Sequence, residues 1–263
     1  MLPLVASGGL VLLTLAVFVG AWTASLRWCA VQVRALEAAK IWFTANLARF
    51  LPGGVWQFAS LAVMAGRYRV SATAATATVL LEQVVLLVTG LGVVAVLTPV
   101  VLRSGWWVWA LVIGIALGAG LLLLPRVTRR IPGLAAVWSQ LRPHQLVAFA
   151  LVLTVPWLLY GTAFMLLATG LLGDVPAAGG GSWSFYVAAF TGSYLAGVIA
   201  VFAPAGLLVR EAALIGVLTP VIGGGDAAIL AIASRLWLTL LEVLAGLVVI
   251  ALPEPSAGVV SDT

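Results

Sequence analysis

Seven long apolar runs, separated by short links, dominate the hydrophobic pattern of this 263-residue chain. Most of the runs reach the roughly 20 residues with which an α-helix crosses the hydrocarbon core of a bilayer. They cover residues 4–26, 41–66, 72–100, 106–124, 146–172, 183–220 and 226–252. The pattern therefore predicts an all-α integral membrane protein built as a polytopic helical bundle.

The basic residues between the runs are distributed unevenly, and their distribution predicts a topology. Cytoplasmic loops of membrane proteins carry an excess of Lys and Arg. The links expected in the cytoplasm by this rule are 27–40, 67–71 and 125–145, and those expected outside are 101–105 and 173–182. Both ends of run 41–66 then lie on the cytoplasmic side. We therefore expect this run to form a re-entrant hairpin that turns at Pro52-Gly53-Gly54.

A similar interruption recurs in the second half of the chain. The residues Ala48, Phe50, Pro52 and Gly54 match the order and spacing of Ala200, Phe202, Pro204 and Gly206, at an offset of 152 positions. The offset places run 41–66 on 193–218. It predicts an inverted repeat of halves 4–100 and 146–252, joined by helix 106–124, with a second hairpin entering from outside. Helix breaks at corresponding places in two halves are typical of a transporter's binding site.

Composition supports a membrane protein and narrows the function classes. Hydrophobic residues make up 63% of the chain and charged residues 8%. The net charge of +5 follows from the loop arginines, so no nucleic-acid partner is expected. The first run has no basic residue before it, and we expect a retained helix in a multi-pass cell-membrane protein. A single cysteine, Cys29, excludes an internal disulfide and a cysteine-based metal site.

Six charged residues lie within or at the edge of apolar runs, where a charge costs several kcal/mol unless it is paired or faces a cavity. They are Arg49, Glu82, Arg210, Glu211, Arg235 and Glu242. Arginine side chains beside helix breaks can bind a phosphate together with free backbone N–H groups. The predicted substrate-binding residues are Arg49, Pro52, Gly53, Gly54, Gln57, Glu82, Pro204, Gly206, Arg210, Glu211 and Arg235. For Arg235 and Glu242 an internal ion pair is an equally good interpretation.

Several blocks of the sequence resemble one membrane-protein family. The blocks NLARFLPGGVWQ, TVLLEQVVLLVTGLG, FAPAGLLVREAAL and SRLWLTLLE are similar to the membrane domain of lysylphosphatidylglycerol synthases, which also occurs as stand-alone proteins. The resemblance implies a flippase-like domain that moves a lipid between leaflets. Leu208 stands where glycine is more usual in this family, which implies a stiffer second tip. We expect no aminoacyl-transfer domain, so synthase activity is not implied.

The sequence thus predicts a transporter of an anionic lipid, either a phospholipid or a polyprenyl-phosphate-linked sugar. No cofactor or metal is expected, and motifs of intramembrane proteases, hydrolases and nucleotide-binding loops are absent from the sequence. A membrane scaffold is one alternative. A multispan glycosyltransferase using Asp174 or Asp226 is another. A second copy of the chain or an associated glycosyltransferase would be a suitable protein partner.

Overall fold

The computed structural model describes residues 1–51, 56–97, 142–173, 182–200, 206 and 208–253. These residues form helices and no strands, which confirms the all-α class. The predicted tip residues Pro52, Gly53, Gly54 and Pro204 and the predicted linking helix 106–124 lie outside the described residues.

Four of the helices are long and apolar enough to cross a membrane, and they coincide with four of the predicted runs. They are α1 (Leu2–Trp28), α4 (Ala72–Leu97), α8 (Pro143–Leu172) and α11 (Gly224–Ala251). Each has between 26 and 30 residues, which corresponds to about 40 Å of helix and exceeds the roughly 30 Å hydrocarbon core. The chain is therefore built as a multi-pass membrane protein.

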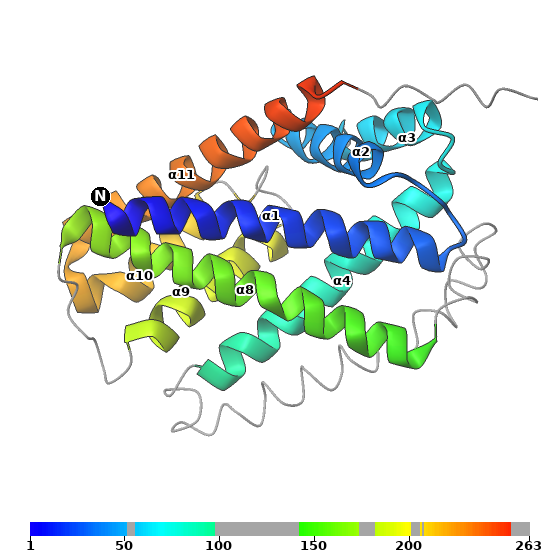
Figure 1. The fold of residues 1–263 in the computed structure, drawn as a ribbon. Helices are drawn as coiled ribbons and strands as arrows, with labels where there is room; N and C mark the ends of the chain where they lie inside the picture. The colour runs from blue at the N-terminus through cyan, green and yellow to red at the C-terminus, as the bar shows by residue number, and fades with distance from the viewer. Residues whose placement is uncertain (52–55, 98–141, 174–181, 201–205, 207, 254–263) are drawn as a thin grey trace, which may run out of the picture.

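The two halves begin with α1 and α8, which lie side by side and run in opposite directions (Figure 1). Near the start of α1, the Ser7 hydroxyl donates a hydrogen bond to the carbonyl of Ala163 near the end of α8, at 2.8 Å. At the other end, the ring of Trp28 packs edge-on against that of Phe149. The first helices of the two halves thus have opposite orientations.

The last helices of the halves, α4 and α11, are oriented oppositely as well. At its start α4 meets the end of α1, where the Trp22 indole donates to the Thr78 hydroxyl at 3.1 Å. In contrast, α11 begins beside the start of α1 and runs with it. Its far end is fixed by Lys40, whose ammonium group donates to the carbonyl of Leu252 at 2.7 Å.

The predicted run 41–66 consists of two packed helices, α2 (Ala35–Ala48) and α3 (Trp56–Arg67). Ala38 near the start of α2 and Ala65 near the end of α3 belong to one core cluster with Leu26 at the end of α1. The outer ends of both short helices therefore lie at the same end of the molecule. Their inner ends point toward its middle.

The predicted run 183–220 is divided in the same way, into α9 (Ser182–Ile199) and α10 (Val209–Ile222). Tyr186 near the start of α9 and Leu218 near the end of α10 share a core cluster with Leu4 and Leu172. These two residues mark the start of α1 and the end of α8. The second pair of short helices thus begins and ends at the opposite end of the molecule from the first.

Each predicted half contains a long helix, two short helices and a second long helix. Helices of one half pack on helices of the other. Helix α2 packs on α11, and its counterpart α9 packs on α4. A glycine allows close approach at each crossing. A Cβ atom on Gly246 of α11 would lie 3.2 Å from the Phe43 ring of α2, and one on Gly90 of α4 would lie 3.2 Å from the Leu195 side chain of α9.

Candidate functional site

A cavity of about 510 Å³ lies where the inner ends of the two short-helix pairs meet. Side chains from all eight helices named above reach its wall or border it. Most of the predicted site residues described by the structure line this cavity: Arg49, Gln57, Glu82, Gly206, Arg210 and Arg235. Glu211 does not line it but contacts Arg235. Residues that are more than 150 positions apart in the sequence are thus brought into one space.

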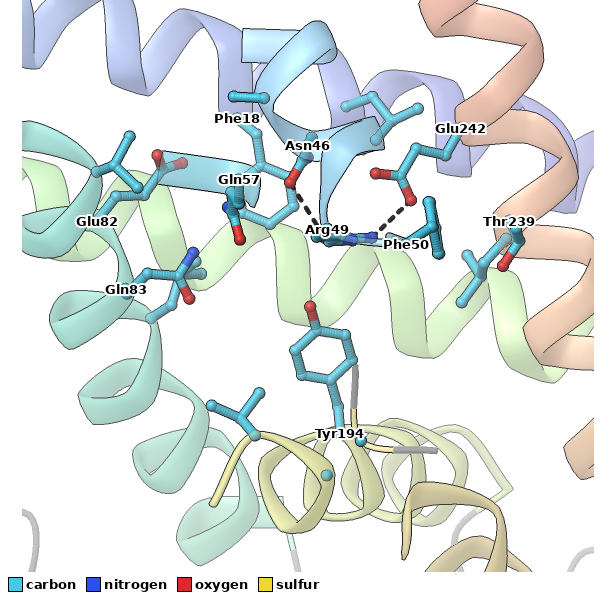
Figure 2. A pocket seen from close by; sticks show the side chains of 18 of the residues that line it. Phe18, Asn46, Arg49, Phe50, Gln57, Glu82, Gln83, Tyr194, Thr239 and Glu242 are labelled. Carbon is cyan, nitrogen blue, oxygen red and sulfur yellow. Dashed lines mark hydrogen bonds and ion pairs between the residues drawn. The ribbon is translucent and has the colours of Figure 1, made fainter. Parts of the chain in front are cut away.

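Arg49, immediately after α2, forms an ion pair with Glu242 of α11. Its Nη2 lies 2.6 Å from Glu242 Oε2, and its Nη1 donates to Asn46 Oδ1 at 3.2 Å (Figure 2). The Arg49 side chain is 33% exposed and that of Glu242 7%. A guanidinium has five N–H donors, so Arg49 keeps donors that can face a ligand. The pair also joins the inner end of α2 to the middle of α11.

Arg235 of α11 forms the second ion pair, with Glu211 in the first turn of α10. The two groups are 2.6 Å apart, from Nη1 to Oε1. A carboxylate in the first turn of a helix also interacts favourably with the helix dipole. Glu211 therefore has two interactions that account for its charge, and it neutralises Arg235 at the edge of the cavity. The alternative interpretation of Arg235 as a member of an internal ion pair fits this geometry.

Arg210, next to Glu211, has no ion pair among the described residues. Its Nη2 is buried and has no hydrogen-bond partner within the described part of the chain. The guanidinium instead lies over two aromatic rings of α9, with its Cζ 4.9 Å from the Phe190 ring centre and 5.2 Å from that of Tyr194. Such contacts stabilise the cation and hold its plane but leave N–H donors unused. This arginine is the best candidate for binding an anion.

Glu82 of α4 lies on the opposite wall of the cavity from Glu242, with the amides of Gln57 and Gln83 between it and Arg49 (Figure 2). The residue is 3% exposed. Its Oε1 has no hydrogen-bond partner among the described residues. Unlike Glu211 and Glu242, it has no arginine within ion-pair distance in that part of the chain.

The segment before α10 has an unusual backbone. Gly206 has a φ of +66°, and a Cβ atom on it would lie 2.8 Å from the Cα of Gly197 in α9. Only glycine fits a position with both restrictions. Leu208 also has a positive φ, of 69°. This residue is 77% exposed. Position 208 is thus one whose backbone favours glycine.

Two tyrosines of the site were not predicted from the sequence. Tyr160 of α8 and Tyr194 of α9 line the cavity, and the hydroxyl of Tyr194 points toward Arg49 (Figure 2). Both lie in apolar helices, where an aromatic residue looks the same whether it faces lipid or a cavity. The sequence held one signal, and it concerns Tyr194 alone. At the offset of 152 this residue corresponds to Trp42, which also lines the cavity.

Apolar side chains surround the inner ends of the short helices. Phe50, Phe58 and Val198 line the cavity and are exposed, and Leu51 and Ile199 are exposed beside them. A large exposed apolar surface is expected where a protein faces lipid. The polar cavity is therefore bordered by surface that hydrocarbon chains can contact.

The described residues contain no group of three or more His, Cys, Asp and Glu side chains placed to hold a metal ion. Comparison of the chain with protein-family profiles, curated proteins and solved structures finds no match. The function is therefore argued from the geometry of the cavity.

Proposed function

We propose that this protein moves an anionic lipid between the two leaflets of a membrane, with the phosphate of the headgroup bound in the central cavity. The observation that carries the proposal is Arg210, whose Nη2 is buried without a hydrogen-bond partner and which has no ion pair among the described residues. Burying a charge without a partner costs several kcal/mol. A bound phosphate would supply the missing partner.

Arg49 would be the second contact of the phosphate. Its pairing with Glu242 holds the guanidinium at the cavity wall, and its remaining donors are available to a headgroup oxygen. Charge-assisted hydrogen bonds from arginine to phosphate are among the stronger ones in proteins and are often bidentate. Arg235 is less suited to this role because Glu211 already neutralises it.

The short helices support a site at membrane depth. Helix α2 has 14 residues and α3 has 12, so each extends about 20 Å and does not cross a core of roughly 30 Å. We propose that α2 with α3, and α9 with α10, are re-entrant hairpins of an inverted repeat that enter from opposite sides. Non-helical backbone at membrane depth is tolerated where it is buried or lines a wet cavity.

The apolar border of the cavity suits the rest of a lipid. The headgroup would enter between the inner ends of the short helices, while the acyl chains stay in the bilayer against Phe50, Phe58 and their exposed neighbours. The protein would thus reduce the cost of taking a charged group through hydrocarbon without enclosing the whole molecule. The resemblance to the flippase-like domain of lysylphosphatidylglycerol synthases points to the same class of substrate.

A scaffold in the membrane is the second candidate, and the two ion pairs favour it. Arg49 with Glu242 and Arg235 with Glu211 each join a short helix to α11, as charges that only fix helix packing would do. A scaffold has no use for a cavity that contains an arginine without an ion pair among the described residues. Lipid movement therefore accounts for more of the site.

The test is movement of a fluorescent phosphatidylglycerol in vesicles that contain the purified protein. Lipid reaching the outer leaflet is bleached by an impermeant reductant added outside, and the bleached fraction reports movement. We expect the fraction bleached to rise well above that in protein-free vesicles. Equal bleaching in the two preparations, with intact folded protein in the vesicles, would contradict the proposal and favour the scaffold. If the bleached fraction rises as expected, mass spectrometry of the lipid that copurifies with the protein would identify the natural headgroup.

A further inference from the structure

We propose that Glu82 is a proton-binding group of the cavity and that the protein binds the anionic headgroup together with a proton. This inference rests on the proposed function, because it concerns the same cavity. It assigns a role to a carboxyl group that neither the ion pairs nor the phosphate site uses.

The surroundings of Glu82 differ from those of the other two buried carboxylates. Glu242 and Glu211 each have an arginine at 2.6 Å. Glu82 is 3% exposed and forms no ion pair among the described residues. Each of the three carboxyl groups has one buried oxygen without a hydrogen-bond partner in that part of the chain, so the missing arginine is what distinguishes Glu82. A buried carboxylate in such a position either takes up a proton or requires a cation from outside the protein.

The cavity around Glu82 contains a limited set of ionisable groups. Helices α1 and α3 contribute none to its lining among the described residues, and Glu82 is the only charged residue of α4. The others are Arg49, directly after α2, and Tyr160, Tyr194, Arg210, Arg235 and Glu242, which belong to α8, α9, α10 and α11. Two of the three arginines are occupied by Glu242 and Glu211. Among the described residues, Arg210 is thus the cavity arginine without a carboxylate partner.

The shared cavity couples the headgroup to the proton, because Arg210 and Glu82 both line it. A phosphate beside Arg210 and an ionised Glu82 would be two anions in one space of low dielectric, where like charges repel strongly. Protonation of Glu82 removes that repulsion. The protonated cavity therefore binds the anion more tightly, and by linkage the bound anion raises the proton affinity of Glu82 to the same extent.

The direction of the pH dependence follows from this coupling. Binding of an anionic lipid should strengthen as pH falls, by up to about tenfold per pH unit in the range where Glu82 titrates in the lipid-free protein. Glu82→Gln resembles the protonated side chain in size and charge. It should bind the lipid at all pH values about as tightly as the wild type does at low pH. Glu82→Asp should keep the pH dependence.

The experiment measures proton uptake directly. Short-chain phosphatidylglycerol is titrated into the detergent-purified protein in a calorimeter, in two buffers with different ionisation enthalpies. The difference between the two heats gives the number of protons taken up for each lipid bound. We expect uptake approaching one proton in the wild type at pH values where Glu82 is ionised before binding, and none in Glu82→Gln. Glu37→Gln is the matched control, since Glu37 caps the start of α2 away from the cavity.

The possible results separate this inference from the proposed function. Lipid binding without proton uptake in the wild type, or with equal uptake in Glu82→Gln, overturns the role of Glu82 and leaves lipid transport standing. Binding that depends on the sodium concentration but not on pH overturns it as well, because Glu82 would then hold a metal cation. Absence of lipid binding at every pH contradicts both. If Glu82→Gln does not fold, Glu82→Asp takes its place: a shifted pH range of proton uptake assigns the proton to position 82, and a range identical to that of the wild type overturns the role of Glu82.

Discussion

Gly206 lies directly against Gly197, so that a Cβ atom on Gly206 would fall 2.8 Å from the Gly197 Cα and 2.9 Å from its carbonyl oxygen. This contact joins the segment before α10 to the end of α9. It holds the inner ends of the second pair of short helices together at the wall of the cavity, next to Arg210. The position of Arg210, the arginine that we propose to bind phosphate, therefore depends on two glycines.

Replacing Gly206 with alanine should destabilise the protein and impair lipid movement. The new methyl group would meet backbone, which cannot move aside as a flexible side chain does, and the positive φ adds strain. We expect a cost of about 1–3 kcal/mol, measured as a lower midpoint of thermal unfolding in detergent. Gly216→Ala in α10 is the control because nothing lies within 4 Å of its Cβ position. Equal midpoints in the two variants would show that the close contact is not important.

The pair of Arg49 and Glu242 should behave as a unit in a double-mutant cycle. Removing Arg49 leaves the buried Glu242 carboxylate without its partner, which costs about 3–5 kcal/mol for a fully buried pair and less here because Arg49 is one-third exposed. Arg49→Gln should therefore lower the unfolding midpoint, and adding Glu242→Gln should restore much of it. Additive effects of the two substitutions would mean that the ion pair contributes no coupling energy.

Leu208 offers a test of backbone strain at the second tip. Its φ of 69° is costly for a residue with a Cβ atom, and its exposed side chain gains little from burial. Leu208→Gly should raise the unfolding midpoint by relieving a strain of about 1–2 kcal/mol. Leu208→Ala removes most of the side chain but keeps the Cβ atom, so it should not raise the midpoint. A rise with alanine equal to that with glycine would rule out strain as the cause.

The orientation of the chain can be tested with single cysteines in a Cys29→Ala background. The basic links predict that Ser71, before α4, and Pro253, after α11, face the cytoplasm, and that Asp226 faces outside. All three positions are exposed in the structure. An impermeant thiol reagent added to intact cells should label only Asp226→Cys. Labelling of both Asp226→Cys and Pro253→Cys from outside would contradict a crossing by α11.

The sequence was sufficient to predict the helices, because each has a distinct pattern. The four long helices are continuous apolar runs, and the predicted run 226–252 differs from α11 by two residues at its start and one at its end. The interruptions near Pro52 and Pro204 marked where the short helices end, since proline and glycine break helices. The re-entrant character of these helices and the inverted repeat stay predictions that the labelling experiment bears on.

The partners within the site could not be derived from the sequence. Three arginines and three glutamates in apolar runs predict ion pairs, but which groups pair depends on helix rotation and on crossings between distant segments. Arg49 and Glu242 are 193 positions apart. Tyr160 and Tyr194 gave no chemical signal because aromatic residues are common on both lipid-facing and buried surfaces. That Arg210 has no ion pair among the described residues emerged only once the other pairs were placed.

The central claim is that Arg210 binds the phosphate of a lipid, and one comparison tests it most directly. Movement of fluorescent phosphatidylglycerol is measured in vesicles that contain wild-type protein, Arg210→Ala, or Arg27→Ala, in which an exposed arginine at the end of α1 is removed. Losing a charge-assisted hydrogen bond to phosphate costs about 1.5–3 kcal/mol, so we expect movement about tenfold to a hundredfold slower in Arg210→Ala. Arg27→Ala should match the wild type. Wild-type rates in Arg210→Ala, with equal amounts of folded protein in the vesicles, would contradict the claim.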